Sequence, residues 1–448
     1  MRTTLSTSDA VWQHPLAQHV QRELGQFSAD QRFVVACSGG RDSLVLADLL
    51  AEYCAGRVRL LHVNHQLQVD APAWARQVQD WSAARGVGCT VCLVQVADGN
   101  QEAQARQARY QAFTEQVQPD EVLVLAHHQQ DQAETVLMRL FSGSGTQGLS
   151  AMRALDCRGN LRFWRPLLGC ARAWIDQFAV LRGLSFVDDP ANQLHQYDRV
   201  YLRQVVLPML QGRWPSVERS MARTAALMQD AAEILAEVVA QDLRVCQSPE
   251  GLDVSALTCL SKARQRQLVA HWMQGEEVYA PPLHRVLAVL DLARAVGTGQ
   301  VSWHTWQFRY YQGQLYRLPR QTKAMPSEVA ELQGLQLGQT IHLASGRWQV
   351  KPVSDGLPLA VLAQPLSVLP RVGGERLHLE GRVGRWPLKK FLQQLNLPVW
   401  QRDQVQILYA GVTANSNVPP LAVLTPKGCF LTTFWRQQQQ PSWRLQRV

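Results

Sequence analysis

The chain has 448 residues, of which 46% are hydrophobic and 18% charged, so it is globular and has the length of two to four domains. Its formal net charge of +9 favours a polyanionic partner, with a merely basic composition as the alternative. The first fifteen residues are too polar for a secretory signal, and no stretch is apolar over the length of a membrane span. The nine cysteines are scattered without the regular spacing of a disulfide framework. We therefore expect a cytoplasmic protein with reduced thiols and no membrane partner.

A glycine turn between an apolar strand and a helix is the feature around which the chain is organised. Residues 33–37 predict a buried strand, and a helix is expected to begin near residues 41–43. Backbone amides and the positive end of the helix dipole make such a turn an anion site, and an aspartate within it suggests that Mg²⁺ accompanies the anion. The alternative is an ordinary Ser/Gly connection. The candidate cofactor-binding residues of this turn are Ser38, Gly39, Gly40, Arg41, Asp42 and Ser43.

The turn is not a Walker A loop, because no lysine follows its glycines. Its sequence, Ser-Gly-Gly-Arg-Asp-Ser, resembles the PP-loop of the N-type ATP pyrophosphatases. Those enzymes hold the pyrophosphate of ATP and adenylate an oxygen atom of a second substrate. The resemblance therefore implies ATP as the nucleotide bound here.

Strands and helices alternate after this turn at the spacing of a doubly wound parallel sheet in an α/β domain. The expected strands are residues 58–63, 89–96 and 121–126. The expected helices are residues 43–54, 74–81, 102–117 and 130–141. Ligands bind beyond the carboxyl ends of the strands in such sheets. We therefore expect three clusters to converge on one site: the turn at Ser38, the pair Asn64–His65, and the pair His127–His128 with the helix that follows it.

Two pairs of charged residues each share one face of a predicted helix. Asp131 and Glu134 are three residues apart at the start of their helix. Their carboxylates can hold Mg²⁺ or an amine, or they merely complement the helix dipole. Arg106 and Arg109 either form ordinary ion pairs or reach a phosphate, and the residues alone do not decide between these interpretations.

Cys89 and Cys92 form a Cys-x-x-Cys pair within a run that predicts a strand. Positions three apart on a strand face opposite ways, so the two thiols cannot jointly hold a metal or form a disulfide. We expect both to be structural cysteines.

Several motifs in the first half of the chain, taken together, resemble the tRNA(Ile)-lysidine synthetases of the bacterial type with a long C-terminal extension. The resemblance is strong over residues 25–215 and looser beyond them. The motifs lie at Ser38–Ser43, His62–His65, Glu102–Tyr110, Asp131–Thr135, Gly143–Leu149, Arg165–Leu167, Asp189–Asn192 and Arg199–Arg203. The chain departs from the family pattern at Gln130, where an aspartate is common, at Val200, where an asparagine is common, and at Val399, where a second proline is usual.

The resemblance implies an enzyme that ligates free L-lysine to the wobble cytidine of a tRNA(Ile) with a CAU anticodon. ATP adenylates the carbonyl oxygen of that cytidine, pyrophosphate leaves, and the lysine amine displaces AMP to give lysidine. By resemblance, Asp42 is the Mg²⁺ ligand, and Asp131 and Glu134 serve Mg²⁺ or lysine. The other implied contacts, to the nucleotide, its phosphates or the activated base, are His65, Arg109, His127 and Arg203.

The rest of the chain is expected to bind tRNA. We predict a catalytic domain over residues 1–215 and a helical connector over residues 216–240. A mainly helical middle domain is predicted over residues 241–320, and a small mixed α+β domain over residues 336–448. The aromatic run 301–311 favours RNA contact and β-strands about equally.

The last domain resembles the family domain that grips the acceptor region of the tRNA. Its candidate tRNA contacts are Lys389, Lys390 and Arg402. For the two lysines, the alternative is a solvated helix face. The sequence leaves open whether the chain forms a homodimer.

Two other functions compete with this interpretation. A PP-loop tRNA thiolase would need reactive paired cysteines near the site, and the only Cys-x-x-Cys is expected in a strand. A tRNA-binding protein without catalysis would have lost the phosphate loop or the carboxylates, and both are present. We therefore favour the ligase.

Overall fold

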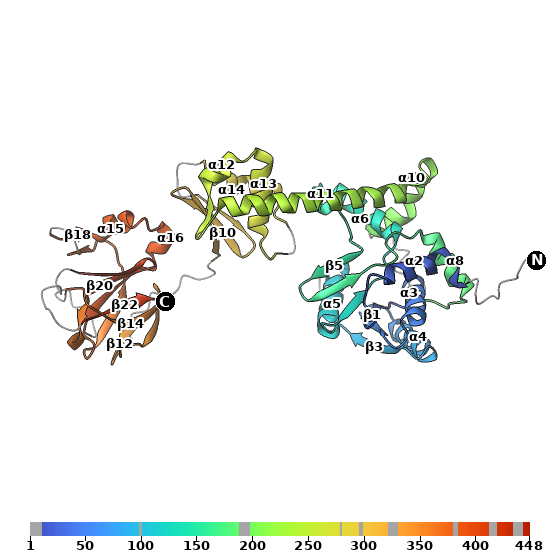
Figure 1. Cartoon of the computed structure of the whole chain (residues 1–448), viewed down its shortest axis with the longest axis horizontal. Helices are drawn as coiled ribbons and strands as arrows, with labels where there is room; N and C mark the ends of the chain where they lie inside the picture. Colours follow the sequence, from blue (N-terminus) through green and yellow to red (C-terminus); the bar gives the residue numbers. More distant parts are fainter. Residues whose placement is uncertain are drawn as a thin grey trace, which may run out of the picture. The chain divides into compact units, whose positions relative to one another are not determined.

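The computed structural model describes residues 11–97, 101–187, 198–277, 280–294, 299–320, 330–379, 384–411, 419–432 and 442–448. The motif Asp189–Asn192 lies outside these residues. The chain divides into two compact units, Met1–Gln241 and Asp242–Val448, which appear in Figure 1. The finer division into four parts stays a prediction. None of the helices in the described ranges is long and apolar enough to cross a membrane.

The first unit alternates strands and helices and then becomes helical. Its elements are α2 (Pro15–Leu24), β1 (Arg32–Ala36), α3 (Arg41–Tyr53), β2 (Val58–Asn64), α4 (Ala71–Ala84), β3 (Gly88–Leu93), α5 (Gln101–Gln116), β4 (Glu121–Val124), α6 (Gln129–Phe141), α7 (Thr146–Leu149), β5 (Leu155–Arg158), β6 (Leu161–Trp164), α8 (Arg172–Leu181), α9 (Asp198–Tyr201), η2 (Leu202–Val206), α10 (Leu207–Arg213) and α11 (Val217–Cys246), the last of which continues into the second unit.

The predicted parallel sheet is confirmed. Its strand order is β3-β2-β1-β4-β6-β5, and β1 lies at the centre, paired in parallel with β2 and β4. Strands β3 and β6 extend the parallel arrangement on either side. The hairpin of β5 and β6, which makes the outer edge antiparallel, was not predicted, because strands of four residues carry too little periodicity to be recognised.

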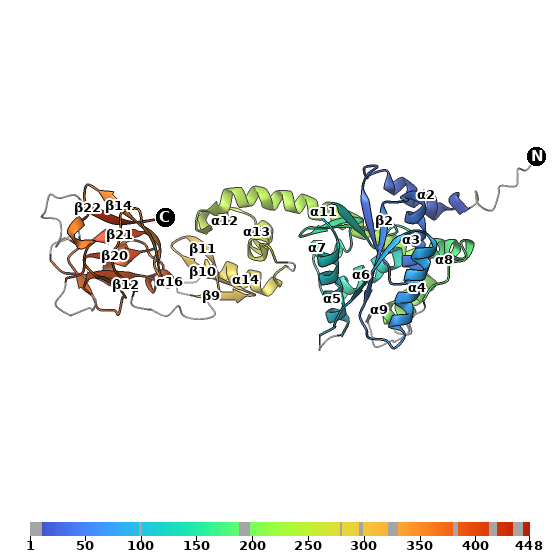
Figure 2. The ribbon, with the colours of Figure 1, turned by 90° about the horizontal axis from the view of Figure 1, so that it is seen from below.

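Helices cover both faces of this sheet, as a doubly wound arrangement requires. Val35 of β1 packs on one side in a cluster with residues of α2, α3 and α8, whereas Val34 packs on the other side with Phe113 of α5. Figure 2 shows α5 on one side of the sheet and α3 and α4 on the other. The strand is buried on both faces, which explains its unbroken apolar run.

The second unit is mostly antiparallel β-structure. Its elements are β7 (Gln247–Ser248), β8 (Gly251–Asp253), α12 (Val254–Cys259), α13 (Lys262–Gln274), α14 (Leu283–Leu292), β9 (Gln300–Trp303), β10 (Trp306–Tyr311), β11 (Gln314–Pro319), β12 (Ala330–Leu332), β13 (Thr340–Leu343), β14 (Gly346–Val353), β15 (Leu357–Pro358), η3 (Leu359–Val361), β16 (Leu366–Pro370), β17 (Arg376–Leu377), β18 (Trp386–Pro387), α15 (Leu388–Gln394), α16 (Val399–Arg402), β19 (Gln406–Ala410), β20 (Ala422–Thr425), β21 (Gly428–Leu431) and β22 (Ser442–Arg447).

The prediction of a mainly helical middle domain is wrong. A five-stranded sheet, β7-β8-β11-β10-β9, accompanies helices α12 to α14. The aromatic run 301–311 forms most of β9 and all of β10, which pair antiparallel with each other. From residue 330 on, a five-stranded and a four-stranded antiparallel sheet share one apolar cluster, and the only helices after η3 in the described part of this region are the short α15 and α16. Short strands between loops gave weaker sequence signals than the helices beside them.

A buried aspartate ties together three helical segments of the first unit. Asp48 of α3 is completely buried and forms ion pairs with Arg85, which follows α4, and Arg182, which follows α8. The Arg182 Nε–Asp48 Oδ2 distance is 2.7 Å. The two guanidinium groups also lie over the rings of Trp81 and Trp12, respectively. The network fixes the helices that cover the face of the sheet formed by the first apolar cluster.

We predict that Asp48→Ala destabilises the protein by about 3 kcal/mol, because it leaves two arginines without their buried counter-charge. The midpoint of urea-induced unfolding measures this loss. Asp120→Asn is the matched control, since Asp120 pairs with Arg32 at the exposed surface and should leave the midpoint unchanged. Equal midpoints for wild type and Asp48→Ala would show that the network contributes no net stability.

Candidate functional site

The predicted phosphate loop lies between β1 and α3, and its path requires glycine at residue 39. Gly39 has φ +85°, in the left-handed region. A Cβ atom there would lie 3.1 Å from Val78 Cγ2 and 3.3 Å from Val187 Cγ2. The Gly39 carbonyl oxygen also accepts a hydrogen bond from the Val187 amide at 2.9 Å. The loop is therefore packed closely on one side, while Ser38 and Gly40 line a cavity on the other.

Two serines hold the turn from within. Ser38 Oγ accepts a hydrogen bond from the Gly40 amide at 3.3 Å, and Ser43 Oγ donates one to the Gly40 carbonyl oxygen at 2.8 Å. Helix α3 begins directly after Gly40 without a side-chain cap. Its first amides are thus available for an anion, as expected of a phosphate site at a helix N-terminus.

A cavity of about 910 Å³ opens beyond the carboxyl ends of β1, β2 and β4. The expected convergence is confirmed in geometry, because most of the predicted site residues line this one cavity. Those residues are Ser38, Gly40, Arg41, Asp42, Ser43, His65, Arg109, His127, Asp131 and Arg203. Gly39 and Glu134 are not among the lining residues. Glu134 is completely buried.

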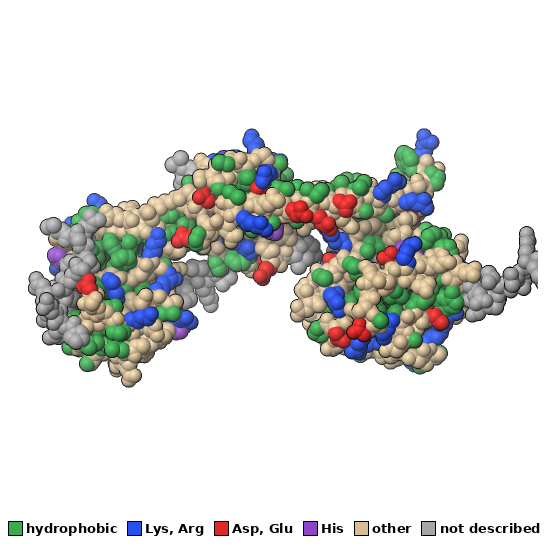
Figure 3. Space-filling view, viewed as in Figure 1, with side chains coloured by type: hydrophobic (Ala, Val, Ile, Leu, Met, Phe, Trp, Pro, Cys, Tyr) green, Lys and Arg blue, Asp and Glu red, His purple; other side chains and the backbone are tan. Residues whose placement is uncertain are grey.

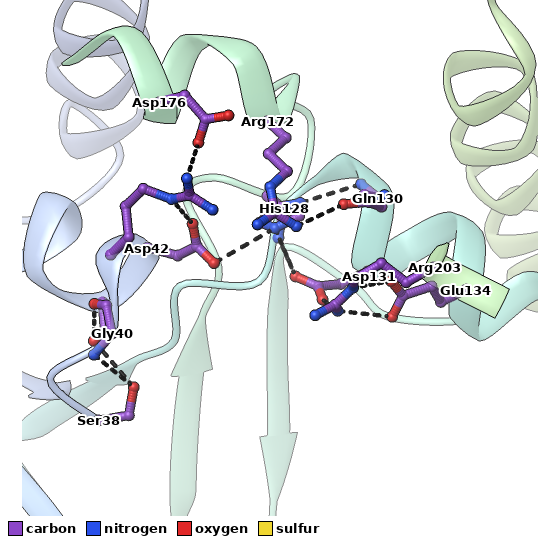
Figure 4. Close-up of polar contacts among 12 residues, drawn as sticks. Ser38, Gly40, Asp42, His128, Gln130, Asp131, Glu134, Arg172, Asp176 and Arg203 are labelled. Carbon is purple, nitrogen blue, oxygen red and sulfur yellow. Dashed lines mark hydrogen bonds and ion pairs between the residues drawn. The ribbon is translucent and has the colours of Figure 1, made fainter. Parts of the chain in front are cut away.

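Asp42 and Asp131 approach the same histidine from two helices (Figure 4). His128 Nε2 lies 3.7 Å from Asp42 Oδ2 and 3.5 Å from Asp131 Oδ2. Burial alone would lower the pKa of His128, but the two neighbouring carboxylates outweigh it and its pKa is raised. Burial would likewise raise the pKa of Asp42, and the histidine and nearby arginines lower it instead. Both carboxylates are therefore ionised near neutral pH.

Glu134 holds Arg203 rather than facing the cavity. Arg203 Nε donates to Glu134 Oε1 at 2.7 Å, and Arg203 Nη2 donates to Glu134 Oε2 at 3.0 Å and to Asp131 Oδ1 at 3.2 Å. This two-point contact occupies both oxygens of Glu134. In this geometry Glu134 orients a cavity arginine, which differs from the direct contact with Mg²⁺ or lysine that the sequence led us to expect.

The local fold brings Arg203 to α6. Leu202 and Leu207 pack with Ala133 and Leu137 of α6 in one buried cluster. Residues 202–206 form a π-helical turn, η2, between two α-helical segments. Single π turns inserted in α-helices recur at functional sites because they redirect side chains.

Positive charge dominates the cavity wall. Two carboxylates, Asp42 and Asp131, line it together with arginines from several elements: Arg41, Arg109, Arg172, Arg199 and Arg203. This surplus suits a ligand that carries several negative charges, such as a triphosphate.

Several buried polar atoms around the cavity have no hydrogen-bond partner among the described residues. They include His65 Nδ1, His127 Nδ1, Arg199 Nε, Arg41 Nε and Asp42 Oδ1. Leaving such groups unsatisfied is costly, and a polar ligand would relieve that cost. The unsatisfied atoms therefore mark the cavity as a binding site for a polar molecule.

Of the three histidines that line the cavity, His62, His65 and His127, the last two are neutral near pH 7. Burial lowers the pKa of His65 to about 4, helped by Arg109 and His62. Burial also lowers the pKa of His127 to about 4, against the opposing effect of Asp131. Each can therefore donate or accept a hydrogen bond near pH 7 without adding charge.

Sequence reasoning assigned no role to three residues that the structure places at the site. His128 contacts both carboxylates, and Arg172 and Arg199 line the cavity. Arg172 Nη1 donates to Gln130 Oε1 at 3.0 Å, so the glutamine at this departure from the family pattern has a defined polar partner. His128 was expected at this edge of the sheet as part of the pair His127–His128, but its contacts with the two carboxylates were not predicted. Arg172 is brought in from a distant helix, and no local pattern indicates it.

Cys89 and Cys92 lie on β3, as predicted, and face opposite sides of the sheet. Cys89 packs against the apolar cluster that contains α3 and α8, whereas Cys92 packs against the cluster that contains Phe113. Neither residue lines the cavity. Their geometry confirms that they cannot act jointly at this site.

The described residues can accommodate Mg²⁺ that arrives with a nucleotide. They contain no group of three or more His, Cys, Asp and Glu side chains arranged to hold a metal alone. Mg²⁺ bound with phosphates usually needs only one or two carboxylates, the rest of its ligands being phosphate oxygens and water. Asp42 Oδ1, which accepts no hydrogen bond within the described chain, and the neighbouring Asp131 fit this requirement.

The candidate tRNA contacts lie in the second unit. Lys389 and Lys390 are exposed in the first turn of α15. Arg402, at the end of α16, is partly buried, and its Nε donates to the Leu397 carbonyl oxygen at 2.8 Å. The lysines are free to reach a partner, whereas part of the arginine is used within the fold.

Models of three protein families match parts of this chain. Residues 15–210 match the PP-loop domain family, residues 252–316 the TilS substrate binding domain, and residues 366–414 the TilS substrate C-terminal domain. A U34-tRNA thiolase, NcsA from Methanococcus maripaludis, is similar in structure over 48% of this chain and 78% of its own, with a TM-score of 0.40 and 18% identity. A similarity this low carries no argument about function.

Curated relatives match nearly the whole chain. The tRNA(Ile)-lysidine synthase of Acinetobacter baylyi is 42% identical over 96% of this chain and 94% of its own length. The enzyme of the same name from Escherichia coli O157:H7 is 36% identical over 87% of this chain and 92% of its own length. The chain therefore belongs to the tRNA(Ile)-lysidine synthases, the ATP-dependent ligases that form lysidine in tRNA.

Proposed function

We propose that the cavity holds ATP, Mg²⁺, free L-lysine and the wobble cytidine of a tRNA(Ile) with a CAU anticodon, and that its residues divide the work as follows. The turn from Ser38 to Ser43 binds the phosphates through the amides at the start of α3. Asp42 and Asp131 would hold Mg²⁺, which would supply positive charge to stabilise the pyrophosphate leaving group. The clustered unsatisfied polar atoms around one arginine-rich cavity carry this proposal.

Adenylation comes first. The carbonyl oxygen of the cytidine attacks the α-phosphorus of ATP, and the bond to pyrophosphate breaks. Arg203, fixed by Glu134, and Arg199 are placed to stabilise the negative charge that develops on the phosphates. Neutral His65 and Arg109, which lie 3.4 Å apart between Nε2 and Nε, are placed to contact the nucleotide or the activated base, as is His127.

Lysine transfer follows. The lysine amine attacks the ring carbon that carries the adenylated oxygen, the carbon–oxygen bond breaks, and AMP leaves. Asp131 lines the cavity with a carboxylate that can attract the cationic groups of lysine. Glu134 supports this step indirectly, through the position of Arg203.

The second unit is proposed to bind the body of the tRNA, with Lys389, Lys390 and Arg402 as contacts to its phosphates. The middle of α11, residues 230–237, is not suited to this task. Asp230, Glu233 and Glu237 are exposed there, and acidic side chains gather along α11 in Figure 3. Phosphates would be repelled from this surface, so RNA contacts are expected elsewhere.

The proposed function predicts that pyrophosphate release from ATP requires an unmodified tRNA(Ile) with a CAU anticodon. Mass spectrometry of the tRNA nucleosides should then show one cytidine that gains the mass of lysine only when lysine is present. Release with other tRNAs but not with this one would contradict the substrate assignment. Release without any tRNA would contradict direct adenylation of the cytidine.

Arg203→Lys should reduce the rate of adenylation by about 10²-fold, because lysine keeps the charge but cannot make the two-point contact with Glu134. Single-turnover release of pyrophosphate measures this rate. Arg213→Lys, at the end of α10 and outside the cavity, is the matched control. An unchanged rate for Arg203→Lys would remove Arg203 from the proposed machinery.

Asp42→Asn should weaken the Mg²⁺-dependent binding of ATP by at least about tenfold, since the amide carries no charge for the metal. Calorimetric titration of the tRNA-free protein with ATP, at several Mg²⁺ concentrations, measures the effect. If ATP binds equally well to both proteins at every Mg²⁺ concentration, Asp42 is not a Mg²⁺ ligand.

His65 should remain uncharged throughout the neutral range. Its pKa is lowered from 6.5 to about 4, so the folded protein binds fewer protons than the unfolded chain between these values. This histidine therefore lowers stability progressively as the pH falls from about 6.5 toward 4. NMR titration of the imidazole resonances, with His65→Gln for assignment, should show no His65 transition above pH 5. A midpoint near pH 6.5 would show that His65 is not buried as described.

A further inference from the structure

His128 uses both ring nitrogens for different purposes. It is the N-cap residue of α6, and its Nδ1 accepts a hydrogen bond from the Gln130 amide at 3.2 Å. A neutral imidazole that accepts at Nδ1 carries its proton on Nε2. That nitrogen lies near the carboxylates of Asp42 and Asp131 (Figure 4).

The Nε2–H group lies between two carboxylates from different elements. Its distances to Asp42 Oδ2 and Asp131 Oδ2 are 3.7 and 3.5 Å, so it is nearly equidistant and committed to neither. A donor at this position attracts both ionised carboxylates at once. The histidine itself is almost completely buried and is not among the residues that line the cavity.

The two carboxylates differ in how firmly they are held. Asp131 is anchored twice, because its Oδ2 accepts from the His128 amide at 2.9 Å and its Oδ1 accepts from Arg203 Nη2 at 3.2 Å. Asp42 has weaker support. Apart from His128, its nearest charged neighbour among the described residues is Arg41, whose Nε lies 3.7 Å from Asp42 Oδ1. Arg41 also forms an ion pair with Asp176, in which Nη1 lies 2.8 Å from Asp176 Oδ1.

We propose that His128 is a positioning residue that fixes Asp42 relative to Asp131, so that both carboxylates are arranged in advance for Mg²⁺ and ATP. This inference rests on the proposed roles of the two aspartates. Ser, Thr, Asp and Asn are the preferred N-cap residues. None of them could cap α6 and also place a second donor between the carboxylates, which gives a physical reason for histidine at this position.

Replacement by asparagine separates the two uses of the ring. Asparagine is a good N-cap, so His128→Asn should keep the start of α6 and the melting temperature of the full-length protein. It lacks the arm that reaches the carboxylates. We expect the Mg²⁺ concentration that gives half-maximal ATP binding, measured by calorimetry without tRNA, to rise by about tenfold or more.

A matched control exists in the same unit. His14 is the N-cap residue of α2 and accepts from the Leu16 amide at 3.2 Å through the same ring nitrogen. It does not line the cavity. His14→Asn should therefore leave both ATP binding and its Mg²⁺ dependence unchanged.

A double-mutant cycle provides a second test that tolerates a modest loss of stability. If His128 acts through Asp42, adding His128→Asn to Asp42→Asn should weaken Mg²⁺-dependent ATP binding no further. If the two substitutions weaken binding by fully additive amounts, His128 is not a positioning residue for Asp42. The same conclusion follows if the His128→Asn variant binds Mg²⁺ and ATP like the wild type. If Asp42→Asn also binds like the wild type, the proposed Mg²⁺ site fails, and the inference fails with it.

Discussion

The parallel pairing of β1 with both β2 and β4 is the constraint on which the site depends. It forces the chain to leave three neighbouring strands at the same edge of the sheet. The phosphate loop, His65 and His127 follow those strands, so residues almost ninety positions apart in sequence face one cavity. Because β1 is buried on both faces, the edge cannot shift without exposing apolar surface to water.

Charge within the cavity is arranged so that each group has a neighbour that limits its freedom. Glu134 is buried, and its two hydrogen bonds with Arg203 hold the guanidinium group in place. Asp131 is shared between the start of α6 and Arg203, and His128 lies between Asp131 and Asp42. Interactions among these buried groups are stronger than they would be in water, so small changes in position alter the site considerably.

The first unit was largely predictable from sequence because its signals are long. A buried apolar strand, a glycine turn and helices of thirteen or more residues leave clear patterns, and the position of Cys89 and Cys92 on opposite faces followed from strand geometry alone. Short strands left no such pattern, so the β5–β6 hairpin was missed and the second unit was mistaken for a more helical one. The contact between Arg203 and Glu134 joins residues 69 positions apart, and only the folded chain reveals that Glu134 serves the arginine.

The π-helical turn η2 limits which deletions this segment of the protein can tolerate. Such a turn is an α-helix with one extra residue, and its looser hydrogen bonding is less stable than the regular form. Deleting one residue after Arg203 would restore a regular helix, yet it would also rotate Leu207 relative to Leu202 and break their joint contact with α6. Regular helical hydrogen bonding and the packing of this segment against α6 thus oppose each other. A lineage of such proteins is therefore expected to retain the extra residue for as long as it needs the arginine.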